Sequence, residues 1–194
     1  MASRSEYKRA LTVPHLWRRP CDICKDECMK RARDKILTVE GLAEAVRRVQ
    51  SAKRSVALCH GCFDILHCGH LRHLEAAREI ADFLVVTVTP DRFVNKGPHR
   101  PVFPEEQRAE LLAGLQIVDW VCVNRWKSAV EIIRLVRPNL FVKGEEYESR
   151  AERVNPNFFA EAKAVEEAGG KVVFTRELTL SSTGAFQRLS VVPK

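Results

Sequence analysis

Two histidines, His67 and His70, flank Cys68 and Gly69 in the sequence. They follow the short apolar run 56–59, which predicts a buried strand, and they precede a helical pattern that runs to Ile80. We therefore expect them at a helix N-terminus, where unpaired backbone N–H groups favour an anion. Gly69 has no Cβ, so a bulky anion can approach the main chain. Imidazole N–H groups there suit a triphosphate under attack at its α-phosphorus, because they can donate to oxygens that gain charge.

The surroundings of this pair decide between two interpretations. On spacing alone, two histidines around a glycine are more often an ordinary loop than an active site. Here, however, the predicted strand leads into a glycine turn at Gly61, then Asp64, and then a helix. This order is the pattern of a crossover that binds phosphate.

Several motifs carry a resemblance to a known family. The run Gly61-Cys62-Phe63-Asp64, followed by His67-Cys68-Gly69-His70, resembles the HxGH signature of the cytidylyltransferase-like nucleotidyltransferases. Within that superfamily it is most similar to the adenylyltransferase domain that activates D-glycero-β-D-manno-heptose 1-phosphate. The similarity extends from about Lys35 to Leu189. Four further segments fall in the family's order: Lys96–Pro101, Glu105–Arg108, Val142–Gly144, and Arg176 with Ser181, Ser182 and Thr183.

The resemblance implies a reaction and a set of site residues. The phosphate of a sugar phosphate attacks the α-phosphorus of a nucleoside triphosphate in line, and pyrophosphate leaves, with Mg²⁺ bridging the phosphates. ATP and heptose 1-phosphate are favoured; CTP with a polyol or amino-alcohol phosphate, and the adenylation of FMN, are alternatives. The catalytic residues would be His67, His70 and Lys96, and Lys96 would also bind the acceptor with Arg108 and Arg125. The nucleotide would contact Gly61, Cys62, Phe63, Asp64, Gly69, Lys143, Gly144, Arg176, Ser181, Ser182 and Thr183.

Strands and helices alternate along the rest of the chain. Nearly continuous apolar runs at 83–89, 120–123, 140–142 and 171–175 predict further buried strands, with helices over 39–49, 104–115, 128–136 and 157–168. This alternation predicts a Rossmann-like α/β fold, a doubly wound parallel sheet of about five strands. Ligands of such sheets bind outside the carboxyl ends of the strands. The polar residues expected at that edge are His67, Asp91, Asn124, Arg125, Lys143 and Arg176, whereas Arg108 by its position on a helix is expected to be exposed.

Three of the seven cysteines, Cys21, Cys24 and Cys28, lie close together in a polar segment. Their thiolates could bind zinc or an iron–sulfur cluster, with His15 as a fourth ligand. A structural zinc site normally adds a second ligand pair, and none is apparent. The spacing fits equally a helix that packs these cysteines onto the domain. Of the others, Cys59 and Cys122 are expected to be buried hydrophobes, and Cys62 and Cys68 to be variable positions of the signature loop.

Length and charge indicate one domain with a basic extension. The chain has 194 residues and a formal net charge of +7, and residues 1–35 hold ten Lys or Arg against five Asp or Glu. We expect residues 1–35 to be an N-terminal extension and residues 36–194 to be the nucleotidyltransferase domain. The extension lacks the interleaved aromatic residues of a base-stacking surface, so nucleic acid is not an expected partner. A metal-dependent nucleic-acid-binding module is nevertheless the alternative from another functional class, and a zinc site of His67, His70 and His73 is a weaker one.

The composition also bears on location and assembly. No apolar run approaches the roughly 20 residues that a membrane helix needs. The N-terminus does not show a secretory signal, and seven cysteines without one point to a reducing compartment. We expect a cytoplasmic homo-oligomeric enzyme, a dimer, with no membrane contact.

Overall fold

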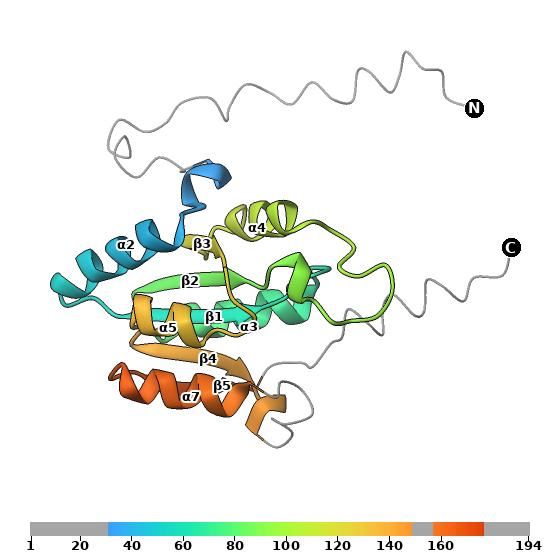
Figure 1. Ribbon diagram of the computed structural model, residues 1–194. Coiled ribbons are helices and arrows are strands. Elements are labelled where there is room, and N and C mark those ends of the chain that lie inside the picture. The colour runs from blue at the N-terminus through green and yellow to red at the C-terminus, as the bar shows by residue number, and fades with distance from the viewer. Residues whose placement is uncertain (1–30, 149–156, 177–194) are drawn as a thin grey trace, which may run out of the picture. The chain divides into compact units, whose positions relative to one another are not determined.

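Five parallel strands form the centre of the fold, in the order β3-β2-β1-β4-β5 (Figure 1). The computed structural model describes residues 31–148 and 157–176, which belong to the unit Arg31–Lys194. The predicted α/β class, with a parallel sheet of about five strands, is confirmed. The strands are β1 (Val56–Gly61), β2 (Phe83–Val88), β3 (Trp120–Val123), β4 (Leu140–Gly144) and β5 (Lys171–Thr175).

Helices cover both faces of the sheet (Figure 1). The 3-10 turn η3 (Ala32–Lys35) precedes the first of them, and η4 (Asp91–Phe93) follows β2. Helices α3 and α4 pack on one face, and α2, α5 and α7 pack on the other. The helices are α2 (Val39–Ser51), α3 (Cys68–Glu79), α4 (Glu105–Ala113), α5 (Val130–Val136) and α7 (Phe158–Glu167).

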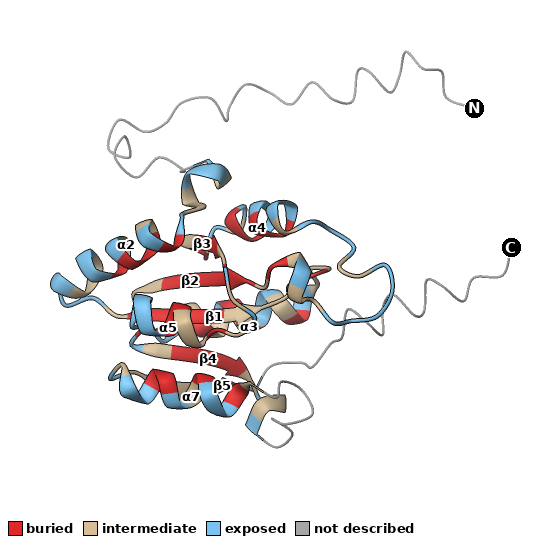
Figure 2. Ribbon diagram, in the orientation of Figure 1, coloured by how far each residue is buried: buried red, intermediate tan, exposed pale blue. Residues whose placement is uncertain are grey.

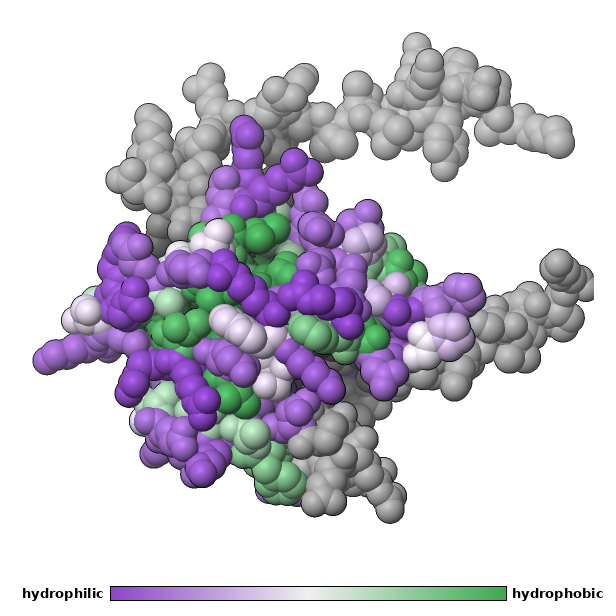
Figure 3. All heavy atoms as spheres, in the orientation of Figure 1, coloured by the Kyte–Doolittle hydropathy of each residue, from purple (hydrophilic) through white to green (hydrophobic). Residues whose placement is uncertain are grey.

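Residues of the central strand β1 alternate between two hydrophobic clusters, one under each helical layer. Val56 and Leu58 pack with α2 and α5, whereas Ala57 and Cys59 pack with α3 and α4. Both sides of the strand are therefore buried, which explains why its sequence is a continuous apolar run. Figure 2 shows the burial concentrated on the strands and the inner sides of the helices. The outer surface over α2, α5 and α7 is mainly hydrophilic (Figure 3).

The order of the strands creates a switch point between β1 and β4. The chain passes from β1 through α3 to β2, and through α4 to β3, before it returns to β4 on the other side of β1. Open α/β sheets bind their ligands in the crevice outside the carboxyl ends of the strands at this point. The loop from β1 to α3 and the end of β4 flank this switch point. His67 and His70, at the start of α3, therefore lie beside the expected ligand site.

Two strand ends near the site differ from the sequence prediction. Strand β1 continues through His60 and Gly61, which pair with Thr87 and Val88 of β2. The strand extends this far because the backbone of both residues pairs with the neighbouring strand β2. Lys143 lies inside β4 rather than after it. Beside η3, Lys35 donates from Nζ to the carbonyls of Leu115 at 3.0 Å and Val118 at 2.9 Å.

The helices bear on whether the described part of the chain could span a membrane. Across residues 31–148 and 157–176, no helix combines the length and apolar composition required to span a bilayer.

The packing of α3 on the sheet gives a first prediction. Leu74 is 0% exposed and Leu71, in the same helix, is 39% exposed. We expect Leu74→Ala to lower the free energy of unfolding by about 2–5 kcal/mol, because it leaves a cavity between α3 and β1. Leu71→Ala should cost under about 1 kcal/mol. Urea unfolding of both variants checks this prediction. Equal losses in the free energy of unfolding would contradict the packing of Leu74 against the sheet.

Candidate active site

His67 and His70 lie side by side at the start of α3. His67 is the N-cap, with extended backbone, and its Nδ1 accepts from the backbone N–H of His70 at 3.4 Å. The two rings are stacked, with centroids 3.8 Å apart and planes at 21°. Because Nδ1 accepts, a neutral His67 ring carries its proton on Nε2. Among the described residues, Nδ1 of His70 is a buried side-chain atom without a hydrogen-bond partner, so its capacity for a hydrogen bond is unused within the described protein.

The environment keeps both imidazoles neutral. Burial lowers the pKa of His70 to about 3, and electrostatic interactions with His67, Lys96 and His73 act in the same direction. Burial, followed by the charge of Lys96, also lowers the pKa of His67. Neutral imidazoles near pH 7 can donate an N–H to phosphate oxygens and can accept a hydrogen bond at the other nitrogen. The pair can therefore stabilise developing negative charge by hydrogen bonds from neutral rings.

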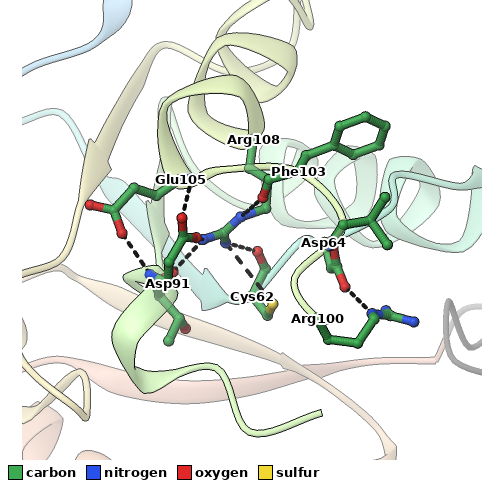
Figure 4. A network of polar contacts seen from close by, with 9 residues as sticks. Cys62, Asp64, Asp91, Arg100, Phe103, Glu105 and Arg108 are labelled. Atoms are coloured by element: carbon green, nitrogen blue, oxygen red, sulfur yellow. Dashed lines mark hydrogen bonds and ion pairs between the residues drawn. The ribbon is translucent and has the colours of Figure 1, made fainter. Parts of the chain in front are cut away.

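The loop between β1 and α3 packs back on the histidines. The Phe63 ring lies 5.4 Å from that of His70, between centroids. A Cβ at Gly61 would come within 3.2 Å of the Phe63 ring, so glycine permits this close approach. Asp64 is 1% exposed. Its carboxylate accepts from Arg100 Nε and, at 2.6 Å, from the backbone N–H of Val102 (Figure 4).

Arg108 is fully buried, so the expectation of an exposed side chain is wrong. Its guanidinium donates to the backbone carbonyls of Phe103 at 3.0 Å, Thr89 at 2.8 Å and Cys62 (Figure 4). It also forms an ion pair with Asp91 at 2.5 Å. A planar group with five donors can join several acceptors at once, which an ammonium cannot. Arg108 thereby connects the signature loop, the end of β2 and the start of α4.

Lys143 is 3% exposed and has protein partners on the α7 side of the sheet. Its Nζ donates to the His60 carbonyl at 3.2 Å and lies 3.4 Å from Glu161 Oε2. The ammonium also sits over the rings of Phe141 and Tyr147, at 4.7 and 4.9 Å from their centroids. Lys143 thus neutralises a buried carboxylate here, and a nucleotide contact would compete with that pairing.

The remaining cations predicted for the site have different surroundings. Lys96 is exposed, and its charge favours a lower pKa of both histidines and of Cys62. Arg125 forms two hydrogen bonds with Glu40 of α2, one of them at 2.8 Å. Arg176 is exposed after β5. Ser181, Ser182 and Thr183 lie outside the described residues.

Metal binding is not supported by the described side chains. Within 31–148 and 157–176, no group of three or more His, Cys, Asp or Glu could hold a metal ion. The zinc site of three histidines is therefore wrong, and His73 instead makes a 2.7 Å hydrogen bond from Nδ1 to Thr175 Oγ1. Cys59 and Cys122 are buried, as expected. Cys21, Cys24 and Cys28 lie outside the described residues.

Sequence reasoning missed Glu161 and the pairing partners of Asp64 and Arg108. Glu161 is 1% exposed, and its Oε1 accepts from the Ala129 N–H at 3.0 Å, just before α5. A signal was present, because Glu161 stands three residues from both Phe158 and Ala164, which are buried on the same helix. The ion pairs of Asp64 and Arg108 join distant segments and have no such local signal.

Comparisons with known proteins identify the family of this chain. A family model described as cytidylyltransferase-like matches residues 58–183. The bifunctional protein HldE of Vibrio cholerae is 40% identical over 139 residues, which is 71% of this chain and 28% of that protein. HldE of Chromohalobacter salexigens is 41% identical over 133 residues, 68% of this chain and 26% of that protein. The chain thus spans under a third of the length of these relatives.

A solved structure is also similar. The crystal structure of the lipopolysaccharide core biosynthesis protein from Thermoplasma volcanium GSS1 is 23% identical, with a TM-score of 0.53. The alignment covers 65% of this chain and 99% of that one, and it shows the shared fold alone. The family match and the similarity to the HldE proteins confirm the resemblance expected from the motifs.

The buried histidines predict how stability depends on pH. Burial lowers the pKa of His60 and His73 to about 4 and that of His70 to about 3. The unfolded chain binds these protons near pH 6.5, so the stabilisation is complete above that pH and is lost as the pH falls towards 4. We expect the free energy of unfolding to fall by up to about 1.4 kcal/mol per pH unit for each histidine.

Urea unfolding between pH 7.5 and 5 measures this slope, and His60→Asn should make it shallower. A free energy of unfolding that is constant over this range would contradict the burial of the histidines.

Proposed function

This chain belongs to the cytidylyltransferase-like family, and we propose that this nucleotidyltransferase transfers an adenylyl group from ATP to a sugar phosphate such as D-glycero-β-D-manno-heptose 1-phosphate, releasing pyrophosphate. The observation that carries the proposal is the stacked pair of neutral imidazoles at the N-terminus of α3, beside the switch point of the sheet. The motif resemblance to heptose 1-phosphate adenylyltransferases and the similarity to HldE proteins support the choice of substrates.

In the proposed reaction the α-phosphate lies against the start of α3. The unpaired N–H groups of the first turn and the helix dipole favour its negative charge. The His67 Nε2–H and the unpartnered Nδ1 of His70 then supply hydrogen bonds as charge grows on the phosphoryl oxygens. The acceptor phosphate attacks in line while pyrophosphate leaves, and the chain forms no covalent intermediate.

The other predicted residues surround this centre. We assign the acceptor phosphate to Lys96, whose charge already acts on both imidazoles. We assign the β- and γ-phosphates to Arg176 with Ser181, Ser182 and Thr183, and the nucleoside to the backbone around Gly61, Cys62, Phe63, Gly69 and Gly144. Arg108 serves this site by holding its loops, because its donors are directed at protein carbonyls and Asp91. Arg125 contributes to acceptor binding only if its pair with Glu40 opens.

Magnesium ions have no protein cage among the described residues. The carboxylates nearest the signature loop are already paired, Asp64 with Arg100 and Asp91 with Arg108. These residues therefore do not fit a magnesium site held by the protein. The cytoplasmic location and the homo-oligomeric state stay predictions.

Release of pyrophosphate tests the proposed function. We expect the highest rate with ATP and heptose 1-phosphate in a grid of four nucleoside triphosphates against sugar, polyol, amino-alcohol and flavin phosphates. His67→Ala and His70→Ala should each lower kcat by about 10²–10³-fold, because each removes hydrogen bonding from the transition state. Arg48→Gln, an exposed change on α2, is the control and should retain full activity.

The grid also separates the alternatives. Activity with CTP and a polyol phosphate, or with ATP and FMN, would replace the proposed substrates while keeping the enzyme class. No activity above the histidine variants for any pair, together with salt-sensitive binding of oligonucleotides, would favour a nucleic-acid-binding module instead.

A further inference from the structure

The segment that carries Lys96 connects η4 to α4 and is fastened at both ends. At its start, the Asp91 N–H donates to Glu105 Oε2 at 2.6 Å, and the Glu105 N–H donates back to Asp91 Oδ2 at 3.2 Å. At its end, Arg108 binds the Phe103 carbonyl. Between these points residues 95–99, including Lys96, are exposed. These contacts hold the ends of the segment and leave its middle to other interactions.

Asp64 supplies that further attachment. Its two carboxylate oxygens accept from Arg100 Nε and from the Val102 N–H, and both belong to the returning half of the Lys96 segment (Figure 4). The side chains of Arg100 and Asp64 are 3% and 0% exposed. A buried ion pair tolerates little change in geometry, because water does not replace a lost partner there. The pair therefore sets where this segment lies on the signature loop.

The position of Asp64 in the chain connects this attachment to the chemistry. Asp64 stands three residues before the N-cap His67, in the loop whose Phe63 ring contacts His70. One short loop thus carries both the attachment of the Lys96 segment and the entry to the paired imidazoles. Loss of the pair would release the Lys96 segment, whereas the start of α3 keeps its own contacts, the His67 cap and the packing of Leu74.

We propose that Asp64 and Arg100 are positioning residues, whose buried ion pair holds Lys96 where the acceptor phosphate lies in line with the α-phosphorus. The inference rests on the proposed function and adds to it a role for two residues that touch neither substrate. It also replaces the expected contact between Asp64 and the nucleotide. Breaking the pair impairs use of the acceptor, while nucleotide binding at α3 is retained.

Steady-state kinetics of three variants test this. Arg100→Gln and Asp64→Asn each remove one charge, and the double variant removes both. Since a misplacement near 1 Å can cost about 10²-fold, we expect each single variant to raise the KM for the sugar phosphate and lower kcat, by about 10–10²-fold in kcat/KM. The KM for ATP should change less than about threefold. The double variant should be no worse than the poorer single variant, because the two residues act as one unit.

A matched control separates positioning from stability. Val46→Ala removes packing on the opposite face of the sheet, under α2, and should lower Tm without changing the ratio of the two KM values. Single variants that lower Tm and leave both KM values unchanged would overturn the proposal. An equal rise in the KM for ATP, or losses that add in the double variant, would overturn it as well.

Hydrogen exchange gives a readout that does not need activity. In Arg100→Gln the amides of residues 94–103, Val102 above all, should exchange faster, while those at the start of α3 keep their protection. If the wild type released no pyrophosphate with any pair of nucleotide and acceptor, the proposed function would fail. The exchange measurement would still show whether the Asp64–Arg100 pair holds the Lys96 segment in place. Unchanged exchange in Arg100→Gln would overturn it.

Discussion

The backbone N–H groups at the start of α3 have no carbonyl partners in their own helix, and this constraint organises the site. His67 satisfies one of them through its side chain and thereby turns its own ring against that of His70. The remaining donors face the carboxyl edge of the sheet at the switch point between β1 and β4, where an anion can complete them. The hydrophobic clusters on both faces matter to function because they hold the helix start at this edge.

Charge around this start is largely committed to protein partners. Arg108, Arg100, Arg125 and Lys143 each have a carboxylate partner among the described residues. Lys96 is exposed and lowers the pKa of both histidines, so it is the cation best placed to meet a ligand. Burial and like charge keep the imidazoles neutral. The site therefore holds hydrogen-bond donors ready, and the proposed function assigns the exposed ammonium of Lys96 to the acceptor phosphate.

The sequence was sufficient to predict the elements that depend on local patterns. The apolar runs predicted all five strands. Thr38 is of a residue type favoured at helix N-caps, and it caps α2, where its side chain accepts from the Gly41 N–H. The position of His67 at the carboxyl edge of the sheet was also predictable. Every strand of a parallel sheet ends at this edge, whatever the order of the strands. The ion-pair partners of Arg108, Asp64 and Arg125 could not be predicted from the sequence. Each lies 17 to 85 residues from its partner, so only the assembled fold brings the charges together.

Binding of a nucleotide at the paired histidines is the central claim, and nitrogen-15 NMR of the imidazoles tests it directly. On addition of α,β-methylene-ATP, a non-reacting analogue, the account predicts shifts of the His67 and His70 ring nitrogens, from values typical of neutral rings. The His60 ring, hydrogen-bonded to Thr87 within the sheet, should remain unchanged. Saturable binding of the analogue with both His67 and His70 unperturbed would contradict the account.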